Sequence, residues 1–361
     1  MMKNFYFLAA FSLLIFSCTK KTETKLTFLD EYDLADSIQF KNTIIGGLSG
    51  VDFVNNQYYF VVDDERNPRV LSANISISDD KIKSVKFNDV ILLADTTNNF
   101  YQKNALDLES VFVDETTNEI YLTSEGSIKN NKLPSVFKSD INGRFLEEIQ
   151  LPENLLNIKS IKHNAAFEAS SKSIDNKGFW VAMEAPLNVD GEEPTFTKTS
   201  SPIRITYFDK STKKATKQFA YQLEHITKPA KGNINLNGVT AMLEYKENQF
   251  LVVERTYQSG YGSHGNIVRI FDVIVDETAT DILEIDALKT SEFTPLKKRL
   301  VFNFEDVEGE LTDKIIDNIE GIAFGPELLN GNKSLLLISD DNFQFYGKQL
   351  NQFILLELQA N

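Results

Sequence analysis

The stretch NIEGIAFGPELLNGNKSLLLISDD at residues 318–341 contains the pattern that decides the fold. A short apolar alternation opened by small or acidic residues is followed by a polar turn and a second apolar run that ends in an acid. The pattern occurs four more times, as GLSGVDFVNNQYYFVVDDE at 47–65, DLESVFVDETTNEIYLTSE at 107–125, AFEASSKSIDNKGFWVAME at 166–184 and NGVTAMLEYKENQFLVVE at 237–254. Alternating apolar residues around Asn, Asp and Gly are typical of β-hairpins. A hairpin that recurs along the chain indicates a repeat architecture.

Two further strand-like runs follow each of the first four hairpins. They are 69–77 and 85–93, 135–139 and 144–151, 203–208 and 217–223, and 267–275 and 299–304. Four antiparallel strands per repeat form the blade of a β-propeller. The sequence therefore predicts an all-β propeller.

The last repeat lacks one strand. Only the run 352–358 follows its hairpin, while a run at 26–34 or 37–40 precedes the first hairpin with nothing else to pair with. We expect the N-terminal strand to complete the last blade, because this closure removes an exposed sheet edge. The prediction is five blades, with six as the alternative if the segment 276–290 adds further pairing.

Composition narrows the class of partner. The chain has 361 residues, 42% of them hydrophobic and 25% charged, which is typical of a globular protein. Its formal charge of −15 argues against nucleic acid, because a phosphate backbone would be repelled over most of the surface. Metal ions, and anionic substrates bridged by a metal, remain compatible with this charge.

The N-terminus resembles a bacterial lipoprotein signal. Lys3 precedes an apolar run at 5–16, and Ser17 places a small residue before Cys18, the only cysteine. In such signals the first segment, here 1–17, is removed and the cysteine is lipidated. The run is too short to span a bilayer, which needs about 20 residues, and a short uncleaved anchor is the alternative.

This signal implies a compartment and a domain plan. We expect a protein of the bacterial cell envelope that meets the membrane only through lipidated Cys18, in the outer membrane and facing the periplasm by default. Residues 18–25 form a polar tether, and 26–361 form a single globular domain.

Acidic residues recur where the repeats bring strand ends together. In a four-stranded meander, the start of the innermost strand and the end of the second lie at the same end of the channel, near the axis. Three acids open inner strands: Glu109, Glu168 and Glu320. Seven close second strands: Asp63, Asp64, Glu125, Glu184, Glu254, Asp340 and Asp341. We predict that they crowd one mouth of the channel.

Such crowding requires positive charge, because two unit charges ~4 Å apart repel by roughly 4 kcal/mol at an effective dielectric of 20. Ca²⁺ is the natural candidate, since it takes six to eight oxygen ligands. Zinc is disfavoured, because the three histidines show no ligand spacing: His163, His225 and His264. Arginine is the alternative compensator, in particular Arg66, Arg255 or Arg204. A plainer alternative is that the acids cap turns and hold the blades in register.

Two long loops lie at the acid-bearing end, at 185–202 and 255–265. Elaborated loops over a rigid scaffold are where binding residues collect. We therefore expect Tyr257 and His264 to contact a ligand there, together with the arginines Arg66 and Arg255.

The repeats are similar to the phytase-like family, described as "esterase-like activity of phytase". The resemblance rests on GLSGVDF, AFEASS, FWVAMEAP, VVERTYQSGYG and DNIEGIAFGPELLNGNKSLLLISDDNF, and it extends over 44–358. It implies a β-propeller in the envelope with a carboxylate-rich mouth and phosphoester or ester hydrolysis. The residues in shared motifs are Glu109, Glu168, Glu184, Glu254, Arg255, Glu320, Asp340 and Asp341. Ser110 and Ala169 depart from the glycine that often follows the inner-strand acid.

Two functions follow as hypotheses. The first is a Ca²⁺-dependent hydrolase of phosphoesters or esters with Glu184 or Glu254 as the base that orients water and Arg255 as the phosphate contact. Its metal ligands would be Glu109, Glu168, Glu320 and Asp340. The second is a non-catalytic propeller that binds a ligand or a partner protein at the same mouth.

Overall fold

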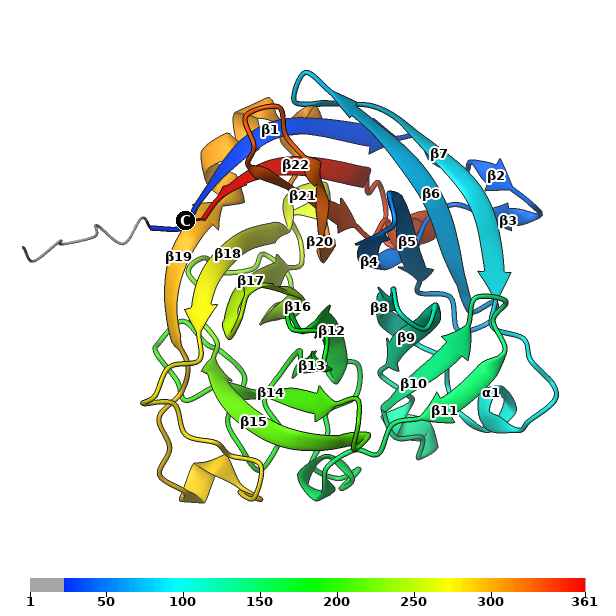
Figure 1. Cartoon of the computed structure of the whole chain (residues 1–361). Coiled ribbons are helices and arrows are strands. Elements are labelled where there is room, and N and C mark those ends of the chain that lie inside the picture. The colour runs from blue at the N-terminus through cyan, green and yellow to red at the C-terminus, as the bar shows by residue number, and fades with distance from the viewer. Residues whose placement is uncertain (1–22, 361) are drawn as a thin grey trace, which may run out of the picture.

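The computed structural model describes residues 23–360, and these form a ring of five four-stranded antiparallel sheets (Figure 1). Cys18 and the predicted signal lie outside the described residues. Blades 1 and 2 contain β4 (Leu48–Val54), β5 (Gln57–Val62), β6 (Arg69–Ser78) and β7 (Lys81–Leu92), then β8 (Leu108–Asp114), β9 (Glu119–Ser124), β10 (Ser135–Asp140) and β11 (Phe145–Glu148). Blades 3 and 4 contain β12 (Phe167–Lys172), β13 (Gly178–Met183), β14 (Pro202–Asp209) and β15 (Lys214–Gln222), then β16 (Asn235–Lys246), β17 (Gln249–Gln258), β18 (Asn266–Ile274) and β19 (Lys297–Asn303).

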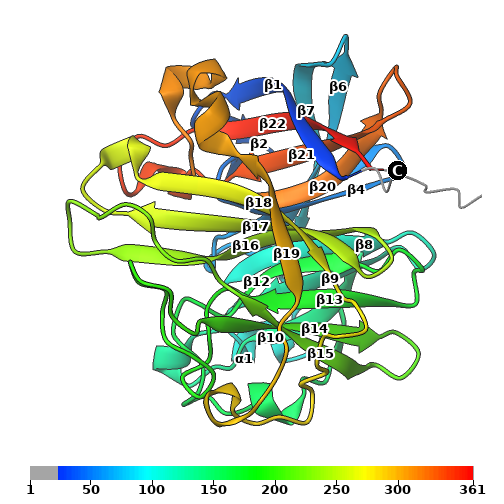
Figure 2. The ribbon, with the colours of Figure 1, turned by 90° about the vertical axis from the view of Figure 1, so that its left-hand side faces the viewer.

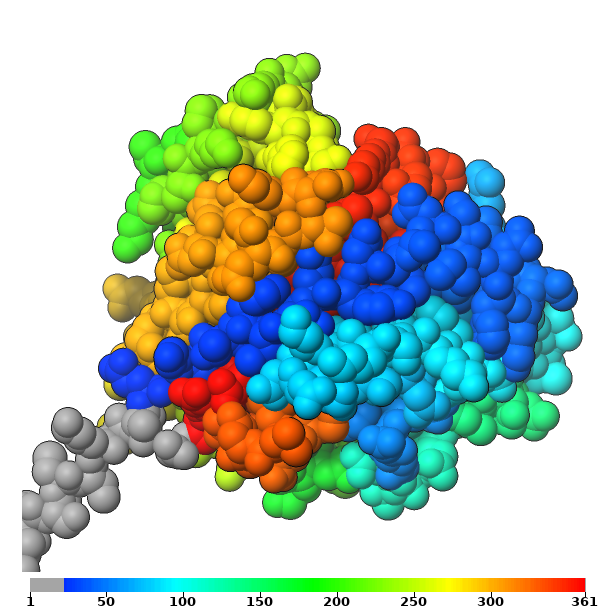
Figure 3. Space-filling view, turned by 90° about the horizontal axis from the view of Figure 1, so that it is seen from above, coloured from blue at the N-terminus to red at the C-terminus, as the bar shows by residue number. Residues whose placement is uncertain are grey.

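The N-terminal strand completes the ring, as predicted. Blade 5 consists of β20 (Ile319–Glu327), β21 (Lys333–Ser339), β22 (Asn351–Gln359) and, outermost, β1 (Lys25–Leu34). β1 pairs antiparallel with β22 from Lys25 opposite Gln359 to Leu34 opposite Asn351. In the space-filling view β1 lies between blade 4 and the β6–β7 hairpin of blade 1 (Figure 3). The five-blade prediction is confirmed.

The segment 276–290 does not add a blade. Its only regular element is a single 3-10 turn, η4 (Leu288–Thr290). The segment instead buries Ile282 and Leu288 against Ala220 of blade 3. The remaining small elements are β2 (Gln39–Phe40), β3 (Thr43–Ile44), α1 (Phe100–Lys103), η1 (Ile128–Asn130), η2 (Glu153–Leu155), η3 (Gly262–His264), η5 (Phe304–Glu310), η6 (Thr312–Lys314) and η7 (Asn342–Gln344). Within residues 23–360, none of the helices has the length and apolar character that a membrane crossing requires.

The hydrophobic core lies between the blades. One apolar cluster joins blades 2, 3 and 4, and three further clusters lie between blades 4 and 5, 5 and 1, and 1 and 2, as a ring of amphipathic sheets requires. Trp180 of blade 3 meets Phe250 of blade 4 edge to face at 5.0 Å, and Phe60 of blade 1 meets Phe353 of blade 5 at 5.7 Å. This packing fixes the angles between blades and leaves the channel ends free for polar residues.

A buried ion pair fastens the long loop of blade 3. Arg204 and Asp190 are both completely buried, with Nε 2.6 Å from one carboxylate oxygen and Nη2 2.8 Å from the other. Asp190 also accepts from the Leu288 amide, and Arg204 donates to the Ile285 carbonyl. Arg204 therefore joins the 185–201 loop to the 276–296 segment and does not neutralise the mouth.

The strands run from one end of the ring to the other (Figure 2). The turns η5 and η6 lie at one end, while the chain enters β1 and leaves β22 at the opposite end. We call the first the acidic mouth, for the residues described next, and the second the tether end.

Candidate metal and substrate site

Five structurally equivalent β-bulges place side chains at the acidic mouth. In every inner strand the register skips one residue opposite the end of the second strand. The skipped residues are Ser49, Glu109, Glu168, Thr240 and Glu320. A bulged residue has no ladder partner and bends its strand, so its side chain is re-aimed. The three inner-strand acids predicted from the sequence all occupy this position.

The same register places a second set of five residues at the mouth, one from each blade. The residues just beyond the pairing partner of each bulge are Asp63, Glu125, Glu184, Arg255 and Asp340. Four of these five are acids, and blade 4 alone contributes a cation. At the bulges, the two hydroxyls donate to carbonyls of the neighbouring blade: Ser49 to Leu108 and Thr240 to Ile319.

Blades 1 to 3 form the half of the mouth that fits a metal ion. Carboxylate oxygens of Asp63, Asp107 and Glu109 lie within 4.8 Å of one another, and so do those of Glu109, Glu125 and Glu168. Glu109 belongs to both triads. Glu109 and Glu168 are only 8% and 7% exposed, yet neither receives a hydrogen bond or ion pair from residues 23–360. An all-oxygen donor set with unpartnered buried carboxylates fits Ca²⁺.

Burial raises the pKa of these carboxyl groups. For Glu109 and Glu168, burial first and neighbouring carboxylates second raise the pKa well above its usual range. Burial, together with Asp340 and Asp107, raises the pKa of Asp63 to about 9. Without a cation, part of this half of the mouth therefore holds protons at neutral pH.

Blades 3 to 5 form a second half, organised by Arg255. Its Nη1 lies 3.4 Å from Glu320 Oε1, and its Nη2 lies 3.7 Å from Glu184 Oε1. Burial raises the pKa of Glu184 to about 7 and that of Glu320 to about 8, against the opposing effect of Arg255. The buried Arg255 Nε has no hydrogen-bond partner. The mouth thus contains a free, buried donor close to the unpartnered carboxylates.

Gly238 creates the room for this arrangement. A β-carbon at Gly238 would lie 2.5 Å from Glu184 Cγ and 3.0 Å from its Oε1. Asn318 supports the other acid by donating to Glu320 Oε1 at 2.7 Å, and its own Oδ1 remains unpartnered.

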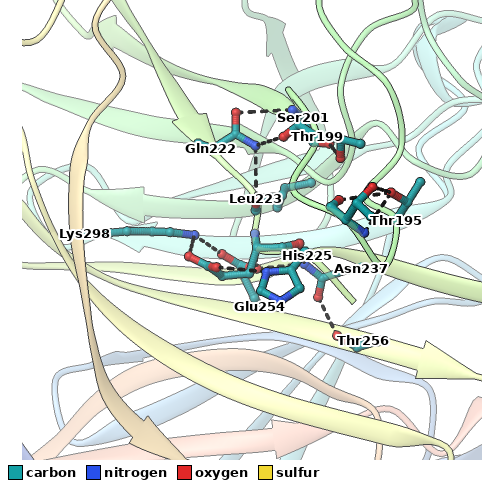
Figure 4. Close-up of polar contacts among 12 residues, drawn as sticks. Thr195, Thr199, Ser201, Gln222, Leu223, His225, Asn237, Glu254, Thr256 and Lys298 are labelled. Atoms are coloured by element: carbon teal, nitrogen blue, oxygen red, sulfur yellow. Dashed lines mark hydrogen bonds and ion pairs between the residues drawn. The ribbon is translucent and has the colours of Figure 1, made fainter. Parts of the chain in front are cut away.

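Glu254 does not lie at the mouth, and this part of the prediction is wrong (Figure 4). Successive side chains of a strand point to opposite sides, and Arg255 takes the inward position. Glu254 is fully buried between blades 3 and 4, where it accepts from Tyr221 at 2.5 Å, Lys298 at 2.6 Å and Asn237 at 2.8 Å. Four donors, including the Glu224 amide, satisfy its two oxygens. Its contacts are those of a structural clamp.

The second acid of each acidic doublet is also structural. Asp64 pairs with Arg69 at 2.7 Å. Asp341 accepts from the Gly47 amide at 2.8 Å and from Asn351 at 3.0 Å. The alternative that strand-end acids cap turns and hold blades in register therefore applies to Asp64 and Asp341. Asp340 also accepts from the Asn342 amide at 2.7 Å, while its carboxyl group lies close to Glu320 and Arg255.

The predicted ligand contacts lie around the mouth at different depths. Tyr257 is half-buried on the same side of β17 as Arg255, two residues further along. Arg66 is exposed in the loop after β5, and His264 is exposed in η3. Neither approaches the triads in the described contacts.

Sequence reasoning left Asp107 out of the site. Asp107 precedes β8 by one residue, and its carboxylate lies in a triad with that of Glu109. The two side chains come close because the bulge at Glu109 turns that side chain away from its usual direction.

The mouth also has an aromatic rim. Phe345 and Tyr346 are 82% and 83% exposed, in the loop that follows Asp340.

This loop rests on strained backbone. Asn342, Phe343 and Gln344 have φ of 45°, 48° and 63°, in the left-handed region that is costly for residues other than glycine. Gly47 permits this, because a β-carbon there would lie 2.4 Å from the Phe343 ring.

Apolar side chains lie beneath the acids in four of the five inner strands. Two residues beyond the bulges lie Val51, Val111, Met242 and Ile322, all buried. They also line a cavity of about 330 Å³ that opens at the tether end.

The fold and site define a five-bladed β-propeller with clustered carboxylates at one end of its channel. The chain belongs to the phytase-like family, whose model, "esterase-like activity of phytase", matches residues 43–343. No curated protein matches the chain.

Three solved structures match the chain at low sequence identity and with TM-scores below 0.5. The chain is 11% identical to the catalytic domain of a GH62 α-L-arabinofuranosidase of Coprinopsis cinerea, covering 93% of this chain and 97% of that one with a TM-score of 0.43. It is 9% identical to the allergen Mala s 1 of Malassezia sympodialis, with 86% and 78% covered and a TM-score of 0.41. It is 9% identical to an exo-β-1,3-galactanase of Phanerochaete chrysosporium, with 92% and 64% covered and a TM-score of 0.46.

Proposed function

We propose that this protein is an envelope-anchored hydrolase of phosphoesters that uses Ca²⁺ at the acidic mouth. The observation that carries the proposal is the shared position of Glu109 in two triads of carboxylate oxygens, each within 4.8 Å. Membership of the phytase-like family supports the reaction class. The lipoprotein-like sequence around Cys18 supports anchoring in the outer membrane, facing the periplasm.

The two halves of the mouth would have different roles, and the first would hold the metal ion. Glu109 and Glu168 would hold Ca²⁺ together with Asp63, Asp107 and Glu125. A bound Ca²⁺ supplies charge neutralisation at phosphate oxygens and a lowered pKa of an attacking water. Glu320 and Asp340, expected as ligands, surround Arg255 and belong to the second half.

The second half supplies a base and an anion contact. Glu184 is the better candidate for the base, because its pKa of about 7 lies near neutral pH, where a general base works best. Glu254 is not a candidate for the base, because its carboxylate accepts four hydrogen bonds between blades 3 and 4. Arg255 donates from its free Nε to a phosphate oxygen, and its fixed charge favours an anionic substrate over a neutral one. Tyr257 lines the wall above it, while Arg66 and His264 would contact only a large substrate.

The test is a hydrolysis assay with matched variants. We expect Ca²⁺-dependent turnover of an aryl phosphate, and a loss of about 10²-fold or more in Glu109→Gln and in Arg255→Gln. Glu115→Gln removes an exposed acid at the tether end and should keep full activity. Equal rates in Glu109→Gln and in the control would contradict the assignment. Faster turnover of a carboxyl ester than of the phosphate would contradict the phosphoester substrate.

A non-catalytic propeller that binds a ligand or protein is the second candidate. The exposed pair Phe345 and Tyr346 favours it, because aromatic residues on a rigid loop are typical of binding surfaces. Saturable Ca²⁺ binding with hydrolysis at background for phosphate and carboxyl esters would select this function.

A further inference from the structure

The root of the tether is fixed to the end of the propeller opposite the acidic mouth. Thr24 is buried and shares a 2.7 Å hydrogen bond with the Tyr245 hydroxyl. Arg299 donates to the Thr24 carbonyl at 3.2 Å. β1 then runs the full height of the ring from this point, so the chain enters the fold at a defined place (Figure 2).

The tether is shorter than the propeller is tall. Six residues lead from Cys18 to Thr24, and they reach at most about 20 Å when fully extended. β1 has ten residues, and at about 3.3 Å per residue it spans about 30 Å between the two ends. A lipid on Cys18 therefore cannot reach the plane of the acidic mouth.

Basic residues cluster at the root of β1 on the tether end. A cavity of about 340 Å³ at the root of β1 is lined by four basic residues, Lys246, Lys297, Lys298 and Arg299, and by two acids, Glu23 and Asp272. Lys246, Lys297 and Arg299 are exposed, and Lys25 is exposed beside them. Lys297 pairs with Asp276 at 2.6 Å and Arg299 with Asp272 at 3.1 Å, whereas Lys25 and Lys246 have no ion-pair partner within residues 23–360. Basic residues near an anionic leaflet strengthen membrane attachment.

We infer that the tether end is a membrane-docking face, on which Lys25, Lys246, Lys297 and Arg299 contact lipid phosphates. The inference rests on the proposed lipidation of Cys18. Docking through this face turns the acidic mouth away from the bilayer and opens it to the aqueous compartment. The substrates it can receive are therefore dissolved ones, and headgroups of the anchoring membrane lie out of reach.

The single cysteine makes a direct test possible. In the lipidated full-length protein the Cys18 thiol is blocked, so one introduced cysteine is the only reactive thiol. Leu329→Cys labels the tether end and Tyr346→Cys the mouth end, at positions that are 93% and 83% exposed. Strand β21 (Lys333–Ser339) separates the two loops by about 20 Å.

Each variant is labelled with a maleimide fluorophore and inserted into vesicles of phosphatidylethanolamine and phosphatidylglycerol that contain a spin-labelled quencher lipid. We expect strong quenching at Leu329→Cys and little at Tyr346→Cys. Equal quenching at both positions, or stronger quenching at Tyr346→Cys, would overturn the orientation.

Charge variants test the contact itself. Lys246→Glu with Lys297→Glu, in the Leu329→Cys background, should lose most of the quenching. Lys228→Glu with Lys231→Glu makes the same charge change in exposed residues at the mouth end and should leave quenching unchanged. If both pairs leave it unchanged, the basic contact is wrong. Mass spectrometry of the purified protein separates the failures: an unlipidated Cys18 overturns the anchoring, whereas lipidated protein without differential quenching overturns only the docking face.

Discussion

Replacing Glu109 by glutamine should have opposite effects on the metal-free and the metal-bound protein. Glu109 is the carboxylate common to both triads, with neighbouring oxygens within 4.8 Å. At that distance two ionised groups would repel by about 3.5 kcal/mol at an effective dielectric of 20. Burial and this repulsion raise the pKa of Glu109, so the folded protein must keep a proton that the unfolded chain has lost at pH 8. Removing the carboxyl group removes that cost and should stabilise the metal-free protein at pH 8. It should also abolish stabilisation by Ca²⁺, because each triad loses an anionic ligand.

The size of the Ca²⁺ effect follows from linkage. A ligand that binds only the native state stabilises it by about 2.7 kcal/mol at 100 times its dissociation constant. Unfolding entropy of about 2.1 cal/mol/K per residue amounts to about 0.7 kcal/mol/K for a domain of this length, so the unfolding temperature should rise by about 4 °C.

Calorimetry of EDTA-treated protein, titrated with Ca²⁺, measures both effects. The native sequence should gain about 4 °C, Glu109→Gln should begin higher and gain nothing, and Glu115→Gln should behave as the native sequence does. A Glu109→Gln protein that still gains the full shift would refute the site. A native protein that gains none would show that protons and Arg255 alone neutralise the mouth.

Three further predictions concern pH and buried charge. Burial raises the pKa of Glu320 from 4.5 to about 8, so the native state keeps a proton that the unfolded state has lost. Metal-free stability should therefore fall as pH rises from about 4.5 to about 8, by up to about 1.4 kcal/mol per pH unit for each such proton, as measured by urea unfolding at different pH values. Lys298→Met should destabilise by about 3–5 kcal/mol, because it leaves Glu254 buried without its cation, and adding Glu254→Gln should recover most of the loss. Arg204→Lys should cost about 2 kcal/mol or more by breaking the two-pronged contact with Asp190, and it should speed proteolysis of the 185–201 loop relative to the native protein.

The architecture was predictable because its determinants are local. Each strand follows from period-two alternation, and each short turn follows from residues that tolerate positive φ, such as Asn55 and Asn56 at 51° and 62°. The closing strand was predictable by elimination, since the last hairpin lacked a partner. The strand predicted at 69–77 is observed as β6, Arg69–Ser78.

The site was only partly predictable, because the sequence shows the acids of each repeat but not the β-bulges that decide which of them face the mouth. From the bulge to the second mouth residue the spacing is 14 residues in blade 1, 16 in blades 2 and 3, 15 in blade 4 and 20 in blade 5, because hairpin turns differ in length. The sequence predicts the acid that ends each second strand as the mouth residue, which is Glu254 in blade 4. The strand register shows that the mouth residue of blade 4 is Arg255. A one-residue shift moves a strand side chain to the opposite side. For this reason Glu254 is buried between the blades, whereas the next residue, Arg255, faces the mouth.

The sequence left two alternatives for neutralising the mouth, a metal ion and an arginine. Arg255 serves one half of the mouth, and the carboxylate triads of the other half are where we propose the metal ion. Arg255 neutralises charge beside Glu184 and Glu320, and it does so at every pH. No such group lies among the described contacts of Glu109 and Glu168, so protons or Ca²⁺ must take that place. Protons and Ca²⁺ therefore compete for the same carboxylates, and metal binding must release protons. The affinity for Ca²⁺ should consequently rise with pH over the range in which these buried acids titrate, while the arginine half keeps its charge for the anion.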